Sequence, residues 1–326
     1  MKIDRKIDAS DMLTVIHSLP TQIEESLSAD VAFETEGKRI IVAGMGGSAI
    51  AGDILGVWLE QSGGFLHVVR DSTLPGWVDS EDTLACVSYS GNTAETLACL
   101  HEGIKRGCQI LCISSGGKMK DVCDSEFVPL IEAPGGLPPR GALGHLFTLL
   151  GRALVQGTDL SDNLRTVVTS LSKLREELAP ESEPNEARAI ADQIVFTSPA
   201  IYAGRDLLPV ARRWKTQLNE NSKKLAWFSG LPEIAHNEVV GWDLEDGTDS
   251  FCAIFLRDEP NRQADSTIAE VKKRAKVVEV VAEGDTLLER AFHVLMVGDF
   301  VSYYCALMRG IDPTPVDAIQ RVKNLR

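Results

Sequence analysis

The sequence predicts an α/β protein with two consecutive doubly wound domains, each a mainly parallel sheet flanked by helices. Three observations carry this prediction. Short apolar segments alternate with longer helical patterns, as in parallel sheets. Glycine-rich or hydroxyl-rich turns follow two of these segments. The alternation then begins again after a polar stretch that contains two prolines.

The first half contains five strand candidates and three helices. The strands are expected at 40–43, 65–69, 84–88, 109–113 and 127–131. Helices are expected from the turn at 44–48 to about residue 60, from 93 to about 105, and over 141–155. Residues 134–139, rich in proline and glycine, end the last strand.

The second half repeats this order after a helix-prone segment at 160–178 and a linker at 179–184. Strands are expected at 199–203, 225–228, 251–256 and 277–281, and helices at 208–219, 268–275, 287–308 and from 316 to the C-terminus. The predicted division is a domain over 1–157, a helical linker over 158–184 and a domain over 185–326.

Length and charge narrow the functional classes. A chain of 326 residues suits two cores better than one. It has no run of 18 apolar residues, and its N-terminus lacks the apolar run of a signal peptide, so we expect a cytoplasmic protein that does not enter membranes. The net charge of −14 opposes binding to nucleic acid or anionic membranes, but a local cluster of donors can still bind a small anion.

The seven cysteines are scattered and form no C-x-x-C pair, which is typical of reduced thiols in a reducing compartment. Cys108, Cys112 and His101 make a poor metal site, because alternate residues of the strand at 109–113 point to opposite faces. We therefore expect no metal and no cofactor. Among the other histidines, His145, five residues after Arg140, is the best candidate for a role beyond structure.

The first turn of interest, 43–49, lies between a strand and a helix. Its glycines, Gly46 and Gly47 among them, let the backbone approach a ligand, and Ser48 opens the helix, whose free N–H groups favour an anion. The same segment also fits the dinucleotide fingerprint G-x-G-x-x-A, with Asp71 placed where a ribose-binding acid is expected. This motif alone leaves both interpretations open.

The second turn favours a sugar phosphate over a dinucleotide. Ser88, Ser90 and Thr93 follow another strand and open another helix, and Gly91 permits a turn of backbone amides. Hydroxyls and amides donate hydrogen bonds to a phosphate without adding charge. A helix N-cap needs one hydroxyl, whereas this segment supplies three.

These motifs resemble the sugar isomerase (SIS) domain family, and more specifically the bifunctional phosphoglucose/phosphomannose isomerases. The matching segments are GGS at 46–48, SYSGNTAET at 88–96, PRGALG at 139–144, LNENSK at 218–223, PEIAHNE at 232–238 and DPTPV at 312–316, with Lys323 beyond them. The resemblance implies two SIS subdomains, a homodimer, no metal, and Ser48, Ser88, Ser90 and Thr93 around the substrate phosphate.

Aldose–ketose isomerisation needs a base that moves a proton between two neighbouring carbons through a cis-enediol. Glu220 resembles the family's base. The enediolate develops negative charge on oxygen, and Arg140, which follows a rigid Pro-Pro pair, resembles the cation that stabilises it. The predicted substrates are glucose 6-phosphate and mannose 6-phosphate, with fructose 6-phosphate as their product.

Sugar phosphates bind mainly as closed rings, so ring opening needs an acid and a base. His236 and Lys323 resemble the residues that do this in the family, where the histidine reaches in from the neighbouring subunit. Gly141 and Ala235 depart from the family pattern, which puts the shape of the sugar pocket in doubt.

Two other functional classes compete with the isomerase. SIS domains also serve as non-catalytic sensors of sugar phosphates, but this chain lacks a basic helix-turn-helix segment and retains Glu220, His236 and Lys323. A nucleotide-dependent oxidoreductase is the third hypothesis, and a thermal-shift response to a nicotinamide cofactor distinguishes it.

Overall fold

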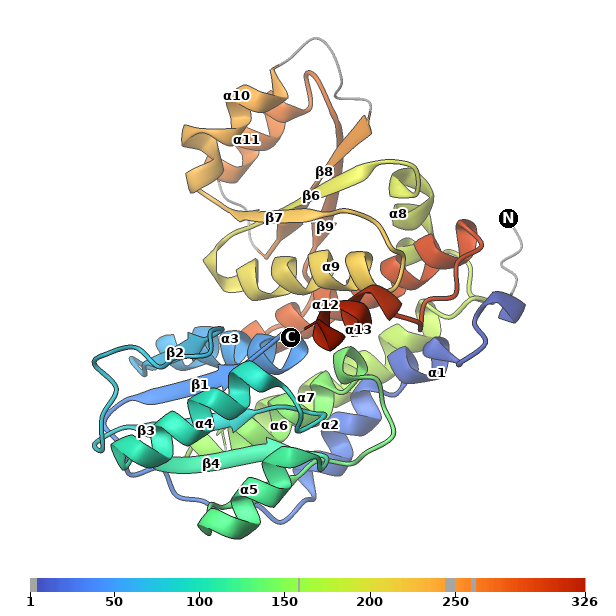
Figure 1. The fold of residues 1–326 in the computed structure, drawn as a ribbon. Coiled ribbons are helices and arrows are strands. Elements are labelled where there is room, and N and C mark those ends of the chain that lie inside the picture. Colours follow the sequence, from blue (N-terminus) through green and yellow to red (C-terminus); the bar gives the residue numbers. More distant parts are fainter. Residues whose placement is uncertain (1–4, 158, 244–249, 259–261, 326) are drawn as a thin grey trace. The chain divides into compact units, whose positions relative to one another are not determined.

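The computed structural model describes residues 5–157, 159–243, 250–258 and 262–325 (Figure 1). These residues form two compact units. The N-unit is Ser18–Thr169, and the C-unit combines the N-terminal residues through His17 with Ser170–Arg326. Both units are α/β with wholly parallel sheets, so the predicted fold class is confirmed.

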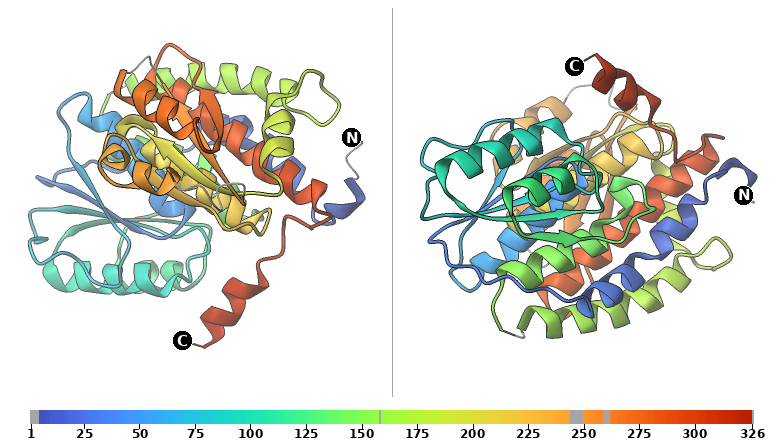
Figure 2. Two further views of the ribbon diagram at one scale, coloured as in Figure 1. Left: turned by 90° about the horizontal axis from the view of Figure 1, so that it is seen from above. Right: turned by 60° about the horizontal axis from the view of Figure 1, so that its bottom comes forward.

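The N-unit contains a five-stranded sheet in the order β2-β1-β3-β4-β5. Its strands are β1 Ile40–Gly44, β2 Leu66–Val69, β3 Thr83–Val87, β4 Gln109–Ser114 and β5 Leu130–Glu132. Its helices are α2 Leu19–Leu27, α3 Gly47–Glu60, α4 Ala94–Arg106, α5 Lys118–Glu126, α6 Leu143–Leu154 and the 3₁₀ helix η2 Pro139–Gly141. Figure 2 (right) shows α4 and α5 along one face, where buried side chains of both helices pack on the strands.

The C-unit contains a four-stranded sheet in the order β7-β6-β8-β9. Its strands are β6 Ser198–Ala203, β7 Trp227–Gly230, β8 Phe251–Arg257 and β9 Lys276–Val281. Its helices are α1 Met12–His17, α8 Glu186–Ile194, α9 Leu208–Glu220, α10 Glu238–Trp242, α11 Arg262–Val271, α12 Leu287–Met308 and α13 Asp317–Asn324, with 3₁₀ helices η1 Arg5–Ile7, η3 Arg205–Leu207 and η4 Glu233–His236. Helix α7, Asp159–Glu177, begins in the N-unit and ends in the C-unit.

Helix α12 is the centre of the C-unit and packs against α1, α8 and α9. It is long and apolar enough to cross a membrane, but 94% of its most apolar window is buried inside the protein. A helix that is apolar on all sides suits the core of a folded unit equally well. In this protein α12 is a core helix.

The nine strands of the described residues lie at the predicted places, with corrections at their ends. The strand predicted at 127–131 starts later, because Phe127 ends α5 in a left-handed conformation (φ 55°) and is 92% exposed. The helix predicted at 268–275 begins and ends earlier in the structure, as α11, Arg262–Val271. Helices α1, α2, α5, α8 and α10 are not among the predicted elements; each is short, with five to nine residues.

The division into units differs from the sequence-based division at two points. Residues through His17 belong to the C-unit, and the segment predicted as a helical linker is mostly the ordered helix α7. After that helix, the buried side chain of Asn185 donates hydrogen bonds to the carbonyl of Leu178 and to the hydroxyl of Tyr304 on α12. Compactness does not test which segments fold independently, so the domain boundaries stay a prediction.

Candidate active site

Two turns of the N-unit lie at the point where its strand order reverses. Strands β1 and β3 are neighbours in the sheet, and Gly44 is in register with Val87. The turn that contains Ser48 follows β1, and the turn that begins at Ser88 follows β3, so both stand at the carboxyl edge of the sheet. Ligands of doubly wound sheets bind in this crevice.

The turn after β1 brings the backbone close to a second segment. Gly46 has a φ of 53°, which favours glycine. A Cβ atom added to Gly47 would lie 3.4 Å from the carbonyl oxygen of Pro139 and 3.6 Å from the Cα of Arg140. Because Gly47 lacks that atom, η2 packs against the start of α3. Arg140 (6% exposed) and Ser48 (7% exposed) are both buried beside this contact.

The turn after β3 joins its hydroxyls to one another. The Ser88 hydroxyl donates to Oγ1 of Thr93 at 3.0 Å, and the amide of Asn92 donates to Oγ of Ser90 at 3.3 Å. Thr93 occupies the N-cap position of α4, yet its side chain does not cap that helix. The hydrogen bond between Ser88 and Thr93 uses one of their two hydroxyl protons, so the other can be donated to a ligand. These hydroxyls are therefore better explained as donors to a phosphate than as a cap on α4.

Gly91 shapes the same turn. Its φ is 65°, and an added Cβ would lie 1.7 Å from the carbonyl oxygen of Gly116. The side chain of Asn92 donates to the carbonyl of Ser90 at 2.9 Å and accepts from the amide of Lys118 at 3.1 Å. The loop after β4 therefore supports the loop after β3.

Glu220 is the last residue of α9 and is partly exposed. The next residue, Asn221, is fully buried, and its amide donates to Oγ of Ser302 on α12 at 2.9 Å. The end of α9 is thus fixed to the core helix α12, while the neighbouring Glu220 is partly exposed to solvent. This support was not predicted from the sequence, where its one signal is Ser302, a polar residue inside a long apolar helix.

The C-unit does not bring Glu220 and His236 together. Helix α9 connects the parallel strands β6 and β7, so it returns the chain to the amino edge of the sheet, where Glu220 lies. His236 ends η4, which follows the carboxyl end of β7, and it is exposed. In Figure 1, β7 runs from the end of α9 towards α10. The two side chains therefore lie at opposite edges of one sheet.

Lys323 lies on the exposed helix α13. Figure 2 (left) shows this helix extending from the segment that follows α12. Ile319 (41% exposed) and Val322 (53% exposed) repeat at helical spacing, which leaves an apolar stripe on its surface.

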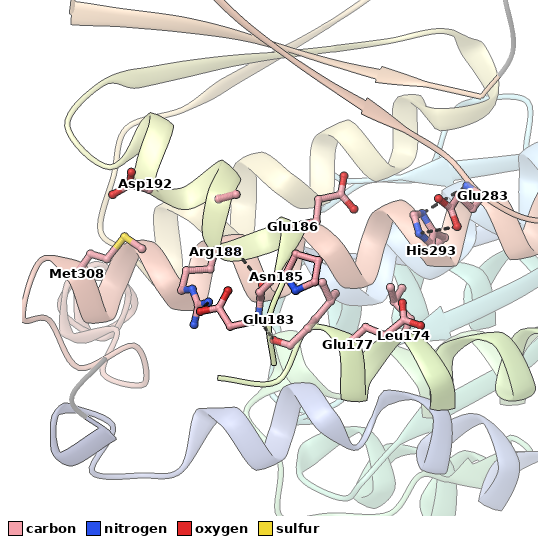
Figure 3. A pocket seen from close by; sticks show the side chains of 13 residues that line it. Leu174, Glu177, Glu183, Asn185, Glu186, Arg188, Asp192, Glu283, His293 and Met308 are labelled. Carbon is pink, nitrogen blue, oxygen red and sulfur yellow. Dashed lines mark hydrogen bonds and ion pairs between the residues drawn. The ribbon is translucent and has the colours of Figure 1, made fainter. Parts of the chain in front are cut away.

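A pocket of about 590 Å³ lies elsewhere in the C-unit (Figure 3). Five acidic side chains are among its lining residues: Glu177, Glu183, Glu186, Asp192 and Glu283. Its Arg188 pairs with Glu183, and burial lowers the pKa of its His293, which disfavours the cationic imidazolium. An acidic lining with a neutral histidine repels a phosphate, so this pocket is a poor site for a sugar phosphate.

The described residues contain no group of three or more His, Cys, Asp or Glu side chains that could hold a metal ion. Cys112 is buried in the sheet, whereas His101 is exposed on α4. His145 is buried in α6, and its Nδ1 lies 2.9 Å from the hydroxyl of Ser26. That hydrogen bond gives His145 a structural role within the N-unit.

Comparisons with known proteins match both units. The family model described as "SIS domain" matches residues 35–120, and the model described as "Bacterial phospho-glucose isomerase C-terminal SIS domain" matches residues 183–325. The bifunctional phosphoglucose/phosphomannose isomerase of Aquifex aeolicus is 34% identical and aligns with 96% of this chain and 97% of its own.

Two further proteins bear on activity and fold. The D-glucosamine-6-phosphate 4-epimerase of Sulfolobus acidocaldarius is 34% identical over 75% of this chain and 77% of its own. The solved structure of a glucose-6-phosphate isomerase like protein from Thermus thermophilus superposes with a TM-score of 0.67 at 20% identity, covering 96% of this chain and 95% of that one. The structural likeness supports the fold.

Proposed function

The chain belongs to the bifunctional phosphoglucose/phosphomannose isomerase family, and we propose that it interconverts glucose 6-phosphate and mannose 6-phosphate with fructose 6-phosphate. The observation that carries this proposal is the near full-length similarity to isomerases of that name. The paired turns at the strand-order reversal of the N-unit agree with a phosphosugar ligand.

The phosphate is proposed to bind to the N-unit. Ser48, Ser88, Ser90 and Thr93 supply hydroxyls, and the backbone at Gly46 and Gly47 approaches the ligand. The protein's net charge of −14 makes a local set of donors necessary for an anionic substrate. Hydrogen bonds from hydroxyls and amides to a charged phosphate are among the stronger ones in proteins.

The proposed reaction begins with ring opening. His236 and Lys323 act as the acid and base at the ring oxygen and the anomeric hydroxyl. Glu220 then takes the proton from C2 of the open-chain aldose, and the electrons of that C–H bond form the C1=C2 double bond while the electrons of the C1 carbonyl move onto O1, giving the enediolate. The proton of the C2 hydroxyl then passes to O1, which leaves the negative charge on O2. Glu220 returns a proton to C1 as the ketone forms at C2. Arg140 stabilises the charge on oxygen in the enediolate.

One enediol accounts for both substrates. Glucose 6-phosphate and mannose 6-phosphate differ only in configuration at C2, and C2 becomes trigonal when its proton leaves. Both sugars therefore converge on the same intermediate, and one base serves both if it can reach the proton from either face. Substrate range then depends on how the sugar chain is oriented, not on a second set of catalytic groups.

The chain is proposed to act as a cytoplasmic homodimer. Glu220 and His236 lie at opposite edges of the sheet of the C-unit, so one unit does not supply both groups to one substrate. A second copy that brings its His236 to the site containing Glu220 resolves this separation. Lys323 must also reach the sugar, which requires that the exposed helix α13 docks when substrate binds.

The test is a coupled assay for fructose 6-phosphate, started separately from glucose 6-phosphate and mannose 6-phosphate with a chelator present. Wild type is compared with Glu220→Gln and with Glu126→Gln, a matched control on an exposed residue of the N-unit. We expect turnover of both sugars, a loss of about 10²–10⁴-fold in kcat for Glu220→Gln and no loss for the control.

Other outcomes point to the competing functions. Binding of both sugars by a folded wild type without turnover would support a sensor. Interconversion at C4 of D-glucosamine 6-phosphate, without fructose 6-phosphate formation, would support the activity that the Sulfolobus relative carries. Loss of activity on addition of chelator would overturn the metal-independent mechanism.

A further inference from the structure

The side chain of Lys223 connects the end of α9 to the segment that precedes α13. Its Nζ lies 2.8 Å and 3.2 Å from the carbonyl oxygens of Glu220 and Asn221, and 2.9 Å from those of both Asp312 and Pro313. An ammonium group has three protons, so these four carbonyls surround it and share them. The four acceptors come from two segments about 90 residues apart in the sequence.

The position of this ammonium is electrostatically favourable. Glu220 and Asn221 stand at the C-terminal end of α9, where backbone carbonyls lack partners within the helix. The helix dipole places partial negative charge at this end, so a cation here is stabilising. Lys223 therefore acts as a side-chain cap on the helix that carries the proposed base.

The backbone of Lys223 is held in an unfavourable conformation. Its φ is 52°, in the left-handed region that costs a non-glycine residue about 1–2 kcal/mol. Such conformations persist where surrounding contacts over-determine them. Here the two buried residues that precede Lys223 are fixed: the side chain of Asn221 donates to Ser302, and the carbonyl of Ser222 accepts from Arg309.

The second segment leads directly to α13. The side chain of Asp312 accepts from the amide of Thr314 at 2.9 Å, which forms a turn, and α13 begins at Asp317. The carbonyls of Asp312 and Pro313 that bind Lys223 belong to this turn. One side chain thus joins the residue that carries the proposed base to the start of the segment that carries Lys323.

We propose that Lys223 is a positioning residue of the isomerase, whose ammonium holds the Glu220 end of α9 and the Asp312–Pro313 turn in fixed relation. The proposal rests on the proposed function for its catalytic consequence. Lys223 touches neither the proton at C2 nor the ring oxygen in this role. It acts by fixing the backbone of Glu220 and the position of the turn that leads into α13.

Lys223→Gly separates positioning from stability. It removes the four carbonyl contacts, but it also relieves the left-handed backbone, which glycine adopts without steric cost. We expect an unfolding midpoint close to that of wild type and a kcat lowered by about 10²-fold, as small displacements of catalytic groups can cause. KM is expected to stay within about threefold, because the phosphate contacts lie in the N-unit.

Two comparisons make this experiment specific. Lys215→Gly removes a cation from the same helix without such contacts among the described hydrogen bonds, and it should lower stability while leaving kcat close to wild type. Lys223→Met removes the ammonium but keeps a similar side-chain volume, and it replaces Lys223→Gly in the kinetic comparison if the glycine variant fails to fold. Because Lys223 is exposed, added propylammonium can enter its site and should partly restore the kcat of Lys223→Gly. It should not change the kcat of Lys215→Gly.

Hydrogen exchange separates failure of this proposal from failure of the proposed function. In Lys223→Gly, amides in 314–323 should exchange faster than in wild type, whether or not the protein is an isomerase. Unchanged exchange, or wild-type kcat in both Lys223 variants, would overturn the positioning role. An inactive wild type whose exchange still responds to Lys223→Gly would overturn the isomerase and leave the connection intact.

Discussion

Arg213 on α9 and Asp299 on α12 form a buried ion pair with two parallel hydrogen bonds. Nε donates to Oδ1 at 3.0 Å and Nη2 donates to Oδ2 at 2.6 Å, with side chains 3% and 5% exposed. The amide of Gln217, one turn further along α9, also donates to Oδ1 of Asp299 at 2.9 Å. A row of polar contacts with α12 therefore runs along α9 to Asn221 and the Glu220 end of the helix.

Breaking this pair on one side is expected to be costly. Asp299→Leu leaves the guanidinium of Arg213 buried without its carboxylate, and we expect a loss of about 3–5 kcal/mol in the free energy of unfolding. The double variant Arg213→Met/Asp299→Leu removes both charges and should recover most of that loss. Urea unfolding measures both, and equal losses in the single and double variants would contradict a coupled pair.

A second prediction concerns the hydroxyl pair of the N-unit. Ser88→Ala removes one proposed phosphate-site hydroxyl and the hydrogen bond that orients the hydroxyl of Thr93. We expect KM for glucose 6-phosphate to rise by about tenfold, which corresponds to roughly 1.4 kcal/mol, with a smaller change in kcat. Steady-state kinetics measures this, with Ser125→Ala on the exposed end of α5 as the control. An unchanged KM would remove Ser88 from the phosphate site.

The sequence predicted the sheets well because buried parallel strands are short apolar runs, such as 40–43, that need no tertiary information. Glycines and hydroxyls also marked the two turns after β1 and β3, which the structure places where the strand order reverses. It could not predict the network from Arg213 to Asn221, because each partner lies about 80 residues away on α12. Asp299 and Ser302 stand out as polar residues within the apolar α12, but nothing in the sequence shows that α9 is the helix they contact.

The left-handed residues illustrate the same limit. Lys223 and Phe127 have positive φ, and nothing in a lysine or phenylalanine predicts that conformation. Their backbones are set by what surrounds them: Lys223 by carbonyls from a distant turn, Phe127 by the end of α5. The support of a site by distant segments is therefore the part that sequence patterns alone do not reveal.

The third prediction is a pH dependence of stability from His145. Burial lowers the pKa of this histidine in the folded protein, and the charge of Glu25 only partly opposes the effect. Below about pH 6.5 the unfolded chain therefore binds a proton that the folded chain does not, so the contribution of His145 falls as the pH drops through that value.

His145→Asn tests this because asparagine does not titrate. The free energy of unfolding should decrease more for wild type than for His145→Asn when the pH is lowered from about 8 to about 5. His293, whose pKa is also lowered by burial, is present in both proteins and cancels in the comparison. Parallel pH profiles for the two proteins would contradict a lowered pKa at His145.

The fourth prediction compares two glycines of the N-unit that both have positive φ. Gly63 (φ 78°) has open space where a Cβ would stand, so Gly63→Ala costs only backbone strain, about 1–2 kcal/mol. At Gly91 (φ 65°) the new Cβ would stand 1.7 Å from the carbonyl oxygen of Gly116, so Gly91→Ala must also displace the loop after β4.

We therefore expect Gly91→Ala to lower the free energy of unfolding by more than Gly63→Ala, and to raise KM for both sugar phosphates, because the displaced loop supports Ser90 and Asn92. Gly63→Ala should leave KM unchanged, since Gly63 follows the far end of α3. Chemical unfolding and steady-state kinetics on the two variants measure both effects. Equal stability losses, with KM unchanged in Gly91→Ala, would mean that the turn after β3 tolerates displacement and does not hold the phosphate.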